Sequence, residues 1–292
     1  MRRLLIIGCG DTALRVVPHL CRRYRIYALT HSRDRMPMLR ERGVVPIAGD
    51  LDDAASIDGL AGIAHDVLHC APPPNHGTRD TRTAHLIAAL AKGKSLPQQL
   101  VYISTSGVYG DCNSEFVDET RPLNPLTERA SRRVDAECQL RDWGRRSGVR
   151  ICVLRAPGIY SSERLPLARL KSGILALKAD EDCYTNHVHA ADLACMAIAA
   201  LRFGHTGRMY NANDDSRLKM GDYFDLVADR YGLPRPQRIS RAEAGARIAP
   251  DLLSFMNESR RLSNRRIKQE LRFKLRYPTV QDGIAAARVE AT

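Results

Sequence analysis

The sequence predicts an α/β fold, a doubly wound parallel sheet followed by a small C-terminal lid. Two observations support this prediction. Short apolar runs alternate with segments of helical periodicity over the first half of the chain. The first apolar run also ends in a glycine-rich turn that opens a helix, as expected for a βαβ unit.

The predicted elements follow one another in the order strand, helix, strand. We expect strands at residues 4–7, 26–29, 44–47, 66–69, 100–104 and 150–154, and helices near 12–24, 79–91 and 127–146. After residue 157 the pattern loosens to a helix near 190–202, a strand at 208–211 and a helix near 219–231. We therefore predict a first domain over residues 1–157. Residues 158–292 are expected to form mainly the lid, with some segments returning to the sheet.

The glycine turn reads Gly8-Cys9-Gly10-Asp11-Thr12-Ala13, the Gly-x-Gly-x-x-Ala form of the dinucleotide fingerprint. Gly8 allows a tight turn, Gly10 lets a pyrophosphate approach the backbone, and Ala13 keeps the helix close to the strand. The helix start at Asp11 and Thr12 offers free N–H groups to phosphates. An ordinary tight strand–helix turn is the alternative. The position between a strand and a helix favours a Rossmann-type nucleotide site.

The composition is that of a soluble globular protein of the cytoplasm. Of its 292 residues, 44% are hydrophobic and 27% charged, and no apolar run approaches the roughly 18–20 residues that cross a bilayer. Its eight cysteines include no Cys-x-x-Cys pair, which argues against zinc and against a disulfide framework. His187 and His189 have no third ligand near them in sequence, so we expect helix capping or packing there and no metal site.

The net charge of +12 is concentrated near the C-terminus. Residues 230–276 contain 13 Arg or Lys and four acidic residues. This basic segment could bind nucleic acid, hold the diphosphate of a nucleotide-linked substrate, or form a solvated face. Aromatic residues make up only 5% of the chain, which disfavours a base-stacking platform for nucleic acid.

The residues after the second strand indicate the cofactor. A free ribose 2′-hydroxyl usually meets an Asp or Glu at this point, whereas an Arg accommodates a 2′-phosphate. Here the chain has no acid and supplies Thr30, Ser32 and Arg33, so we predict NADP(H) and disfavour NAD(H). The alternative is that Arg33 is a plain surface residue. Asp50 and Leu51 are expected to border the adenine, although Asp50 could equally cap the next helix.

Five further segments complete the pattern, at residues 70–73, 104–110, 124–127, 154–160 and 186–194. Together with the glycine turn they resemble the extended short-chain dehydrogenase/reductase superfamily, in its NAD-dependent epimerase/dehydratase branch, over nearly the whole chain. The resemblance implies a catalytic Thr105 and a loop at residues 161–164 that borders the substrate. It also implies further cofactor contacts at Cys70, Ala71, Pro72, Ser104, Ala156 and Gly158.

The sequence departs from this family at the catalytic pair. Family members carry Tyr-x-x-x-Lys on the helix after Thr105; the Tyr is the acid/base, and the Lys holds the nicotinamide ribose. Here Arg129 and Arg133 stand at those two positions, one helical turn apart. Arg133 can still donate to the ribose, but Arg129 stays protonated and cannot be a general acid. Arg129 can instead clamp an anionic substrate or stabilise an oxyanion.

Three hypotheses remain open. The chain is an oxidoreductase or epimerase that uses another acid, from Tyr109, Tyr160, Thr105 or a bound water. Alternatively, it binds NADP(H) without turnover and acts as a redox sensor. The third hypothesis, a nucleic-acid binder, is disfavoured. The resemblance further implies a nucleotide-sugar or a similar carbonyl or hydroxyl substrate, and a homodimer formed through the helices near 79–91 and 127–146.

Overall fold

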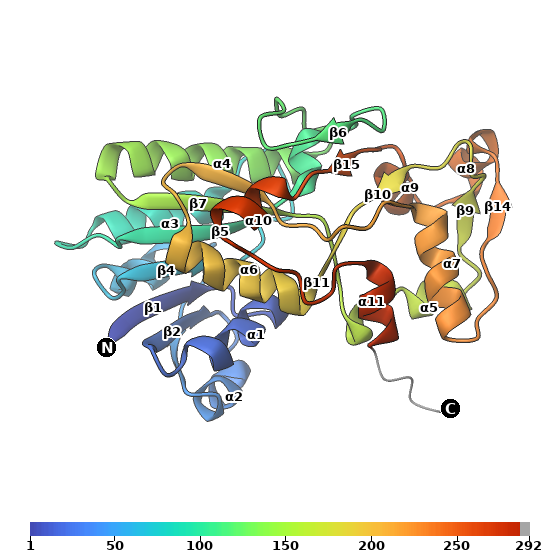
Figure 1. Ribbon diagram of the computed structural model, residues 1–292. Coiled ribbons are helices and arrows are strands. Elements are labelled where there is room, and N and C mark those ends of the chain that lie inside the picture. Colours follow the sequence, from blue (N-terminus) through green and yellow to red (C-terminus); the bar gives the residue numbers. More distant parts are fainter. Residues whose placement is uncertain (287–292) are drawn as a thin grey trace.

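The computed structural model describes residues 1–286, and its centre is a seven-stranded sheet in the order β12-β7-β5-β4-β1-β2-β3 (Figure 1). Every neighbouring pair in this sheet is parallel. Its strands are β1 (Arg2–Ile7), β2 (Tyr24–Thr30), β3 (Val44–Ala48), β4 (Asp66–His69), β5 (Gln99–Thr105), β7 (Arg150–Ala156) and β12 (Arg208–Asn211). The predicted doubly wound α/β fold is confirmed.

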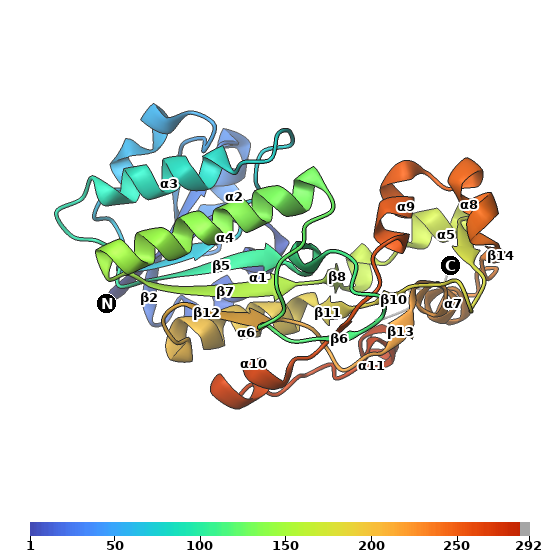
Figure 2. The same cartoon turned by 90° about the horizontal axis from the view of Figure 1, so that it is seen from above.

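Helices cover both faces of the sheet (Figure 2). One face packs against α1 (Asp11–Leu20), α2 (Met36–Glu41) and α6 (Ala190–Phe203), and the other against α3 (Thr81–Ala91) and α4 (Glu128–Ser147). Alternate residues of β1 divide between the two cores: Leu4 and Ile6 face α1, whereas Leu5 and Ile7 face α3. This is why the central strands are apolar throughout rather than alternating.

A third core lies beyond the carboxyl ends of the strands (Figure 1). We call it the lid. It contains α5 (Leu167–Lys171), β9 (Leu175–Leu177), α7 (Met220–Arg230), β14 (Gln237–Ile239), α8 (Arg241–Arg247), α9 (Pro250–Met256) and α11 (Val280–Ala285). The remaining strands form short pairs, β6 (Phe116–Val117) with β15 (Arg261–Leu262), β8 (Gly158–Tyr160) with β11 (His187–His189), and β10 (Tyr184–Thr185) with β13 (Leu218–Lys219). Helix α10 (Arg265–Glu270) follows β15.

Two features of the chain order bear on the predicted elements: the path of the chain after residue 157 and the end of the first helix. After the lid begins, α6 packs on the large sheet and β12 pairs with β7. The helix predicted over 12–24 instead ends at Leu20, because Tyr24 pairs with Arg2 as the first residue of β2. The domain boundary at residue 157 stays a prediction, and the last residues of the predicted lid, 287–292, lie outside the described residues.

A buried polar network ties α4 to the sheet. Glu137 on α4 and Arg155 on β7 are each 1% exposed, and Arg155 Nη2 donates to Glu137 Oε2 at 2.7 Å. Ser104 at the end of β5 donates to the other carboxylate oxygen at 2.6 Å. Arg155 Nη1 also donates to the Tyr109 hydroxyl at 2.9 Å, and that hydroxyl donates to Asn211 on β12. The network therefore joins β5, β7 and β12 to α4.

Replacing Glu137 by Ala leaves the Arg155 guanidinium buried without its counter-charge. We expect the free energy of unfolding to fall by about 3–5 kcal/mol, measured by urea denaturation. Glu115→Ala is the matched control, because the Glu115–Arg121 pair is exposed and should contribute little to stability. Equal losses for the two variants would contradict the prediction.

Candidate functional site

The glycine turn joins β1 to α1 at the carboxyl edge of the sheet. Gly8 has φ of +81°, and a Cβ there would lie 2.5 Å from the Ala71 nitrogen, so only glycine fits. A Cβ on Gly10 would meet nothing within 4 Å, so this backbone faces open space. Gly10 also precedes α1 without a side-chain cap. The N–H groups of the first turn of α1 can therefore bind a phosphate.

Two hollows meet at this turn and form one groove, which we call the strand-end groove. Both are lined by Gly8, Gly10 and Cys70. The first runs along the ends of β1, β5 and β7 and is lined by the predicted residues Asp11, Thr12, Ala13, Ser104, Thr105, Arg133 and Ala156. The second crosses the ends of β2, β3 and β4 and is lined by Thr30, Asp50, Leu51, Ala71 and Pro72. The fold thus brings most of the predicted cofactor residues together.

The segment after β2 differs from the sequence prediction. Ser32 and Arg33 do not line the groove, and Arg33 is exposed at the start of a 3-10 turn over Arg33–Arg35. Arg35, at the other end of that turn, lines the groove with His31. Its Nη2 donates to the Cys9 carbonyl oxygen at 2.7 Å. A 3-10 turn has three residues per turn, so side chains two positions apart point in different directions.

Arg133 and Thr105 lie where the groove meets the end of β5. Arg133 Nη1 donates to the Tyr102 hydroxyl and to the Ile103 carbonyl oxygen, both at 2.9 Å. These bonds hold the guanidinium beside the strand end. Thr105 Oγ1 accepts the Gly107 N–H at 3.2 Å, and Thr105 lines both the groove and the cavity beyond it.

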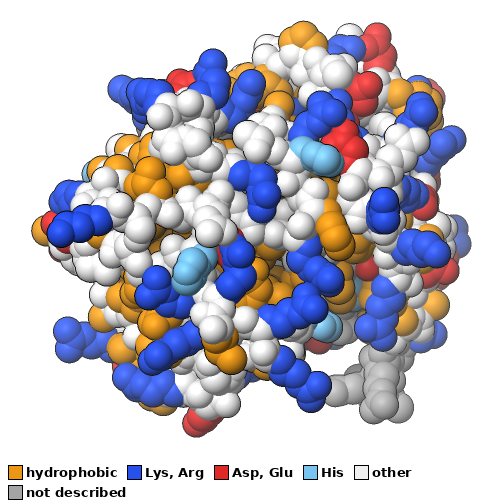
Figure 3. Space-filling view, turned by 60° about the vertical axis from the view of Figure 1, so that its left-hand side comes forward, with side chains coloured by type: hydrophobic (Ala, Val, Ile, Leu, Met, Phe, Trp, Pro, Cys, Tyr) orange, Lys and Arg blue, Asp and Glu red, His pale blue; other side chains and the backbone are white. Residues whose placement is uncertain are grey.

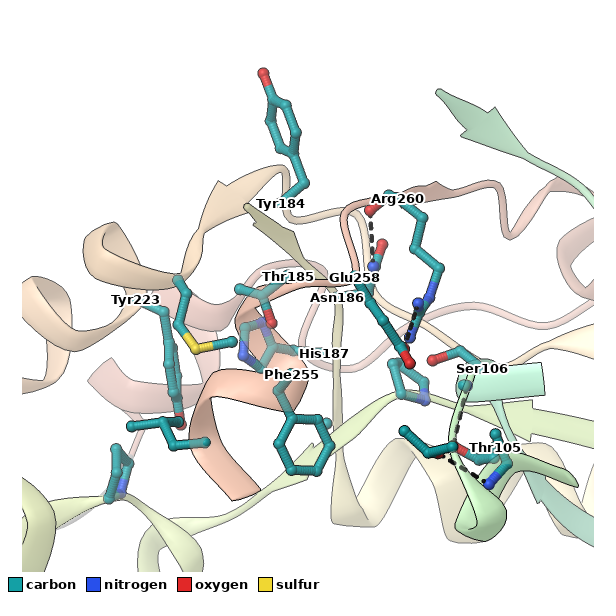
Figure 4. Close-up of a pocket in the computed structure, with 18 of the residues that line it drawn as sticks. Thr105, Ser106, Tyr184, Thr185, Asn186, His187, Tyr223, Phe255, Glu258 and Arg260 are labelled. Atoms are coloured by element: carbon teal, nitrogen blue, oxygen red, sulfur yellow. Dashed lines mark hydrogen bonds and ion pairs between the residues drawn. The ribbon is translucent and has the colours of Figure 1, made fainter. Parts of the chain in front are cut away.

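That cavity has a volume of about 320 Å³ and separates the sheet edge from the lid; we call it the lid pocket (Figure 4). It shares Thr105, Pro157 and Arg164 with the strand-end groove, so the two spaces are adjacent. Gly158, predicted to contact the cofactor, lines this pocket and not the groove. Its charged lining consists of four arginines and one carboxylate: Arg129, Arg164, Arg169, Arg260 and Glu258. An excess of positive charge favours an anionic ligand.

Arg129 is an exposed residue of the lid-pocket lining. Its Cζ is 4.2 Å from the centroid of the Phe255 ring on α9, a cation–π contact. The residue at the family's tyrosine position therefore connects α4 to the lid. On the face shown in Figure 3, Lys and Arg are far more frequent than Asp and Glu.

Tyr109, which the sequence analysis predicts to be catalytic, lies in the interior of the protein. Tyr109 is 1% exposed and lines neither the groove nor the lid pocket. Its hydroxyl is held by Asn211 and Arg155 in the buried network, and burial raises its pKa to about 12. Tyr160 is buried too, and its hydroxyl donates a hydrogen bond to the Thr279 carbonyl oxygen at 3.2 Å. Neither residue lines the lid pocket, and interior polar groups bind both hydroxyls.

The two histidines have structural surroundings. His189 Nδ1 accepts the Ala191 N–H at 3.2 Å, which caps α6 as expected. The His187 ring stacks on Tyr223 with centroids 4.2 Å apart, and burial lowers its pKa to about 3. Within residues 1–286, no group of three or more His, Cys, Asp or Glu could hold a metal ion. In the same part of the chain, no helix is both long enough and apolar enough to span a membrane.

Sequence reasoning missed much of the lid pocket. Tyr223, Phe255, Glu258, Arg169 and Arg260 line it, and none belongs to a motif that the sequence reveals. They come from α7, α9, α5 and the loop before β15, which only tertiary packing brings together. The one available signal was weak: Glu258 and Arg260 lie in the basic segment 230–276, among many other charges.

Comparison with known proteins identifies the family. The chain is 25% identical to a mouse (Mus musculus) dTDP-D-glucose 4,6-dehydratase over 122 residues, which is 39% of this chain and 34% of that protein. The match thus spans only about a third of the curated relative. A functionally unknown conserved protein from Silicibacter pomeroyi has 29% identity and a TM-score of 0.83, covering 98% of each chain.

A dTDP-glucose 4,6-dehydratase from Streptomyces venezuelae, solved with NAD and DAU bound, has 20% identity and a TM-score of 0.77. The match covers 97% of this chain and 94% of that one. This second likeness shows a shared fold. The model of the NAD-dependent epimerase/dehydratase family matches residues 15–212, two thirds of the sequence, and the chain belongs to that family.

Proposed function

We propose that this chain binds NADP(H) in the strand-end groove and oxidises, reduces or epimerises a nucleotide-sugar in the lid pocket. One observation carries the proposal. Thr105 borders both spaces, so a ligand in the groove and a ligand in the pocket would meet beside it. A bound nicotinamide supplies reversible hydride transfer. Membership of an NAD-dependent family supports a nicotinamide cofactor.

The groove residues fit the parts of such a cofactor. The open N-terminus of α1 and the Gly10 backbone would hold the diphosphate. The Asp11 carboxylate beside them would repel the negative diphosphate. Its charge is compensated, however, by ion pairs with Arg15 at 2.9 Å and with Arg164 at 3.5 Å. Arg133, held by Tyr102 and Ile103, would donate to the nicotinamide ribose.

The lid pocket fits an anionic substrate. Arg129 and Arg169 are exposed side chains at its lining, and Arg164 reaches both the pocket and the groove. Guanidinium groups bind phosphate oxygens in pairs, which suits a diphosphate. The named activity of the dehydratase relatives supports a nucleotide-sugar as the substrate class.

A homodimer is part of the same proposal. Helices α3 and α4 lie side by side on one face of the sheet (Figure 2). Ala84, Ala88 and Ala91 on α3 are exposed, which leaves a surface of small residues suited to close helix packing. Light scattering at working concentration should give the mass of a dimer, and a monomer would count against it.

The preference for NADPH over NADH should depend on Arg35. We expect Arg35→Ala to weaken NADPH roughly 10–100-fold and to leave NADH nearly unchanged, because a charged hydrogen bond is worth about 1.5–3 kcal/mol. Binding is measured by nicotinamide fluorescence. Arg33→Ala, on the same 3-10 turn but outside the groove, is the matched control and should change neither. Equal weakening of both cofactors by Arg35→Ala would refute the 2′-phosphate contact.

Turnover itself is tested with the purified protein, NADPH or NADP⁺, and a panel of UDP-glucose, dTDP-glucose and small carbonyl compounds. Nicotinamide absorbance and product masses are followed together, since an epimerase consumes no net cofactor. We expect conversion of a nucleotide-sugar. Tight NADPH binding without turnover of any compound would overturn the enzyme proposal and support a redox sensor.

A further inference from the structure

The proposed reaction needs a proton carrier that the motif residues do not provide. Arg129 holds the position of the family's tyrosine, and a guanidinium keeps its protons in proteins. Tyr109 and Tyr160 are bound in the interior. Thr105 and a bound water, the other two alternatives, are weak acids that need a partner base, so the candidates are the other groups that line the lid pocket, where the substrate is proposed to bind.

Three titratable groups of that lining are poorly suited. Burial lowers the pKa of His187 to about 3, so its imidazole is uncharged near neutral pH and is a weak base. Tyr223 stacks on that ring, and burial raises its pKa. Tyr184 lies between Lys219 and Arg261, whose charges are 5.7 and 5.1 Å from its ring centroid. Figure 4 shows the Tyr184 hydroxyl directed away from Thr105 and Ser106.

Glu258 is the one Asp or Glu that lines the lid pocket among the residues described. It is 7% exposed, and Arg260 Nη1 donates to its Oε2 at 2.8 Å. The same nitrogen donates to the Gly110 carbonyl oxygen at 2.6 Å, and the Ser259 N–H bonds to Asp111 at 2.8 Å. The segment 258–260 is thus fastened to the loop that directly follows the turn after Thr105.

Figure 4 places the Glu258 carboxylate and the Arg260 guanidinium together, on the side of the pocket nearer Thr105 and Ser106 than Tyr223. The Nε of Arg260 is buried and has no hydrogen-bond partner.

Arg129 is linked to this carboxylate through the lid. It packs on Phe255, and the Phe255 carbonyl oxygen accepts the Glu258 N–H at 3.3 Å. The arginine that replaces the tyrosine therefore contacts the segment that carries Glu258. Arg129, which cannot carry the proton, and Glu258, which carries a carboxylate, are thus joined by one series of contacts.

We propose that Glu258 is the catalytic acid/base of this chain, an inference that rests on the proposed function. In the oxidising direction, the substrate's secondary alcohol loses its O–H proton to the Glu258 carboxylate. Its C–H bond breaks with the electron pair leaving as hydride to the oxidised nicotinamide, and a carbonyl forms. In the reducing direction the protonated Glu258 returns that proton to the oxygen as hydride comes back to carbon.

The test compares Glu258→Gln and Glu258→Asp with Glu119→Gln as a matched control. Glu119 is 6% exposed and paired with Arg266 at 3.4 Å, but it lies outside the lid pocket. We expect Glu258→Gln to slow turnover about 100-fold or more. Glu258→Asp, which keeps a carboxylate, should lose less of the rate, and Glu119→Gln should keep the wild-type rate. NADPH affinity and melting temperature report whether each variant is folded.

A second readout needs no turnover. The protein is labelled with ¹³C at the glutamate carboxyl carbons and studied by NMR. The signal that disappears in Glu258→Gln is assigned to Glu258, and the signal that disappears in Glu119→Gln is assigned to Glu119. Addition of UDP-glucose or dTDP-glucose should shift the first signal and leave the second unchanged. An unshifted Glu258 signal on binding, or full activity in Glu258→Gln, overturns the assignment while the proposed function stands. Absence of both binding and turnover in the wild-type protein overturns the proposed function itself, and this inference with it.

Discussion

The buried contact between Glu137 and Arg155 holds the site in place. It fixes α4 against β7, and through Ser104 and Tyr109 it includes the end of β5 and the strand β12. Arg129 and Arg133 lie on α4, so their positions depend on where this contact sets the helix. Thr105 follows Ser104 directly. A charge pair removed from water must be fully paired to be tolerated, and this requirement leaves α4 little freedom to shift along the sheet.

The network also explains how the C-terminal part of the chain is attached. Asn211, which accepts from Tyr109, donates to the carbonyl oxygens of Val117 and Ser263. The basic segment 230–276 uses many of its charges in similar contacts: Arg238 binds Asp225, Arg266 binds Glu119, and Lys268 binds Asp215. Other cations of the segment are exposed, including Arg247, Arg265, Arg272 and Lys274, which fits a solvated basic face. Arg260 at the lid pocket fits the substrate hypothesis as well.

The large sheet and part of the site could be predicted from the sequence. The apolar runs gave the strands because central parallel strands are buried on both faces, and the glycine turn marked the groove because Gly8 cannot be replaced beside Ala71. Local reasoning failed at Arg33 and Tyr109. Both lie next to well-predicted strands, but the direction of a side chain after a strand end depends on the turn that follows and on buried partners far away in sequence.

By itself, the sequence determined the alternating fold, the glycine turn, and the loss of the tyrosine and lysine at residues 129 and 133. These depend on residue type and on spacing within one segment. Only the tertiary structure decided that Arg35 and not Arg33 lines the groove, that Tyr109 is buried, and that Glu258 meets the pocket. The physical reason is that Thr105 and Glu258 are separated by more than half of the chain, and only packing of the lid against the sheet edge brings them to one cavity.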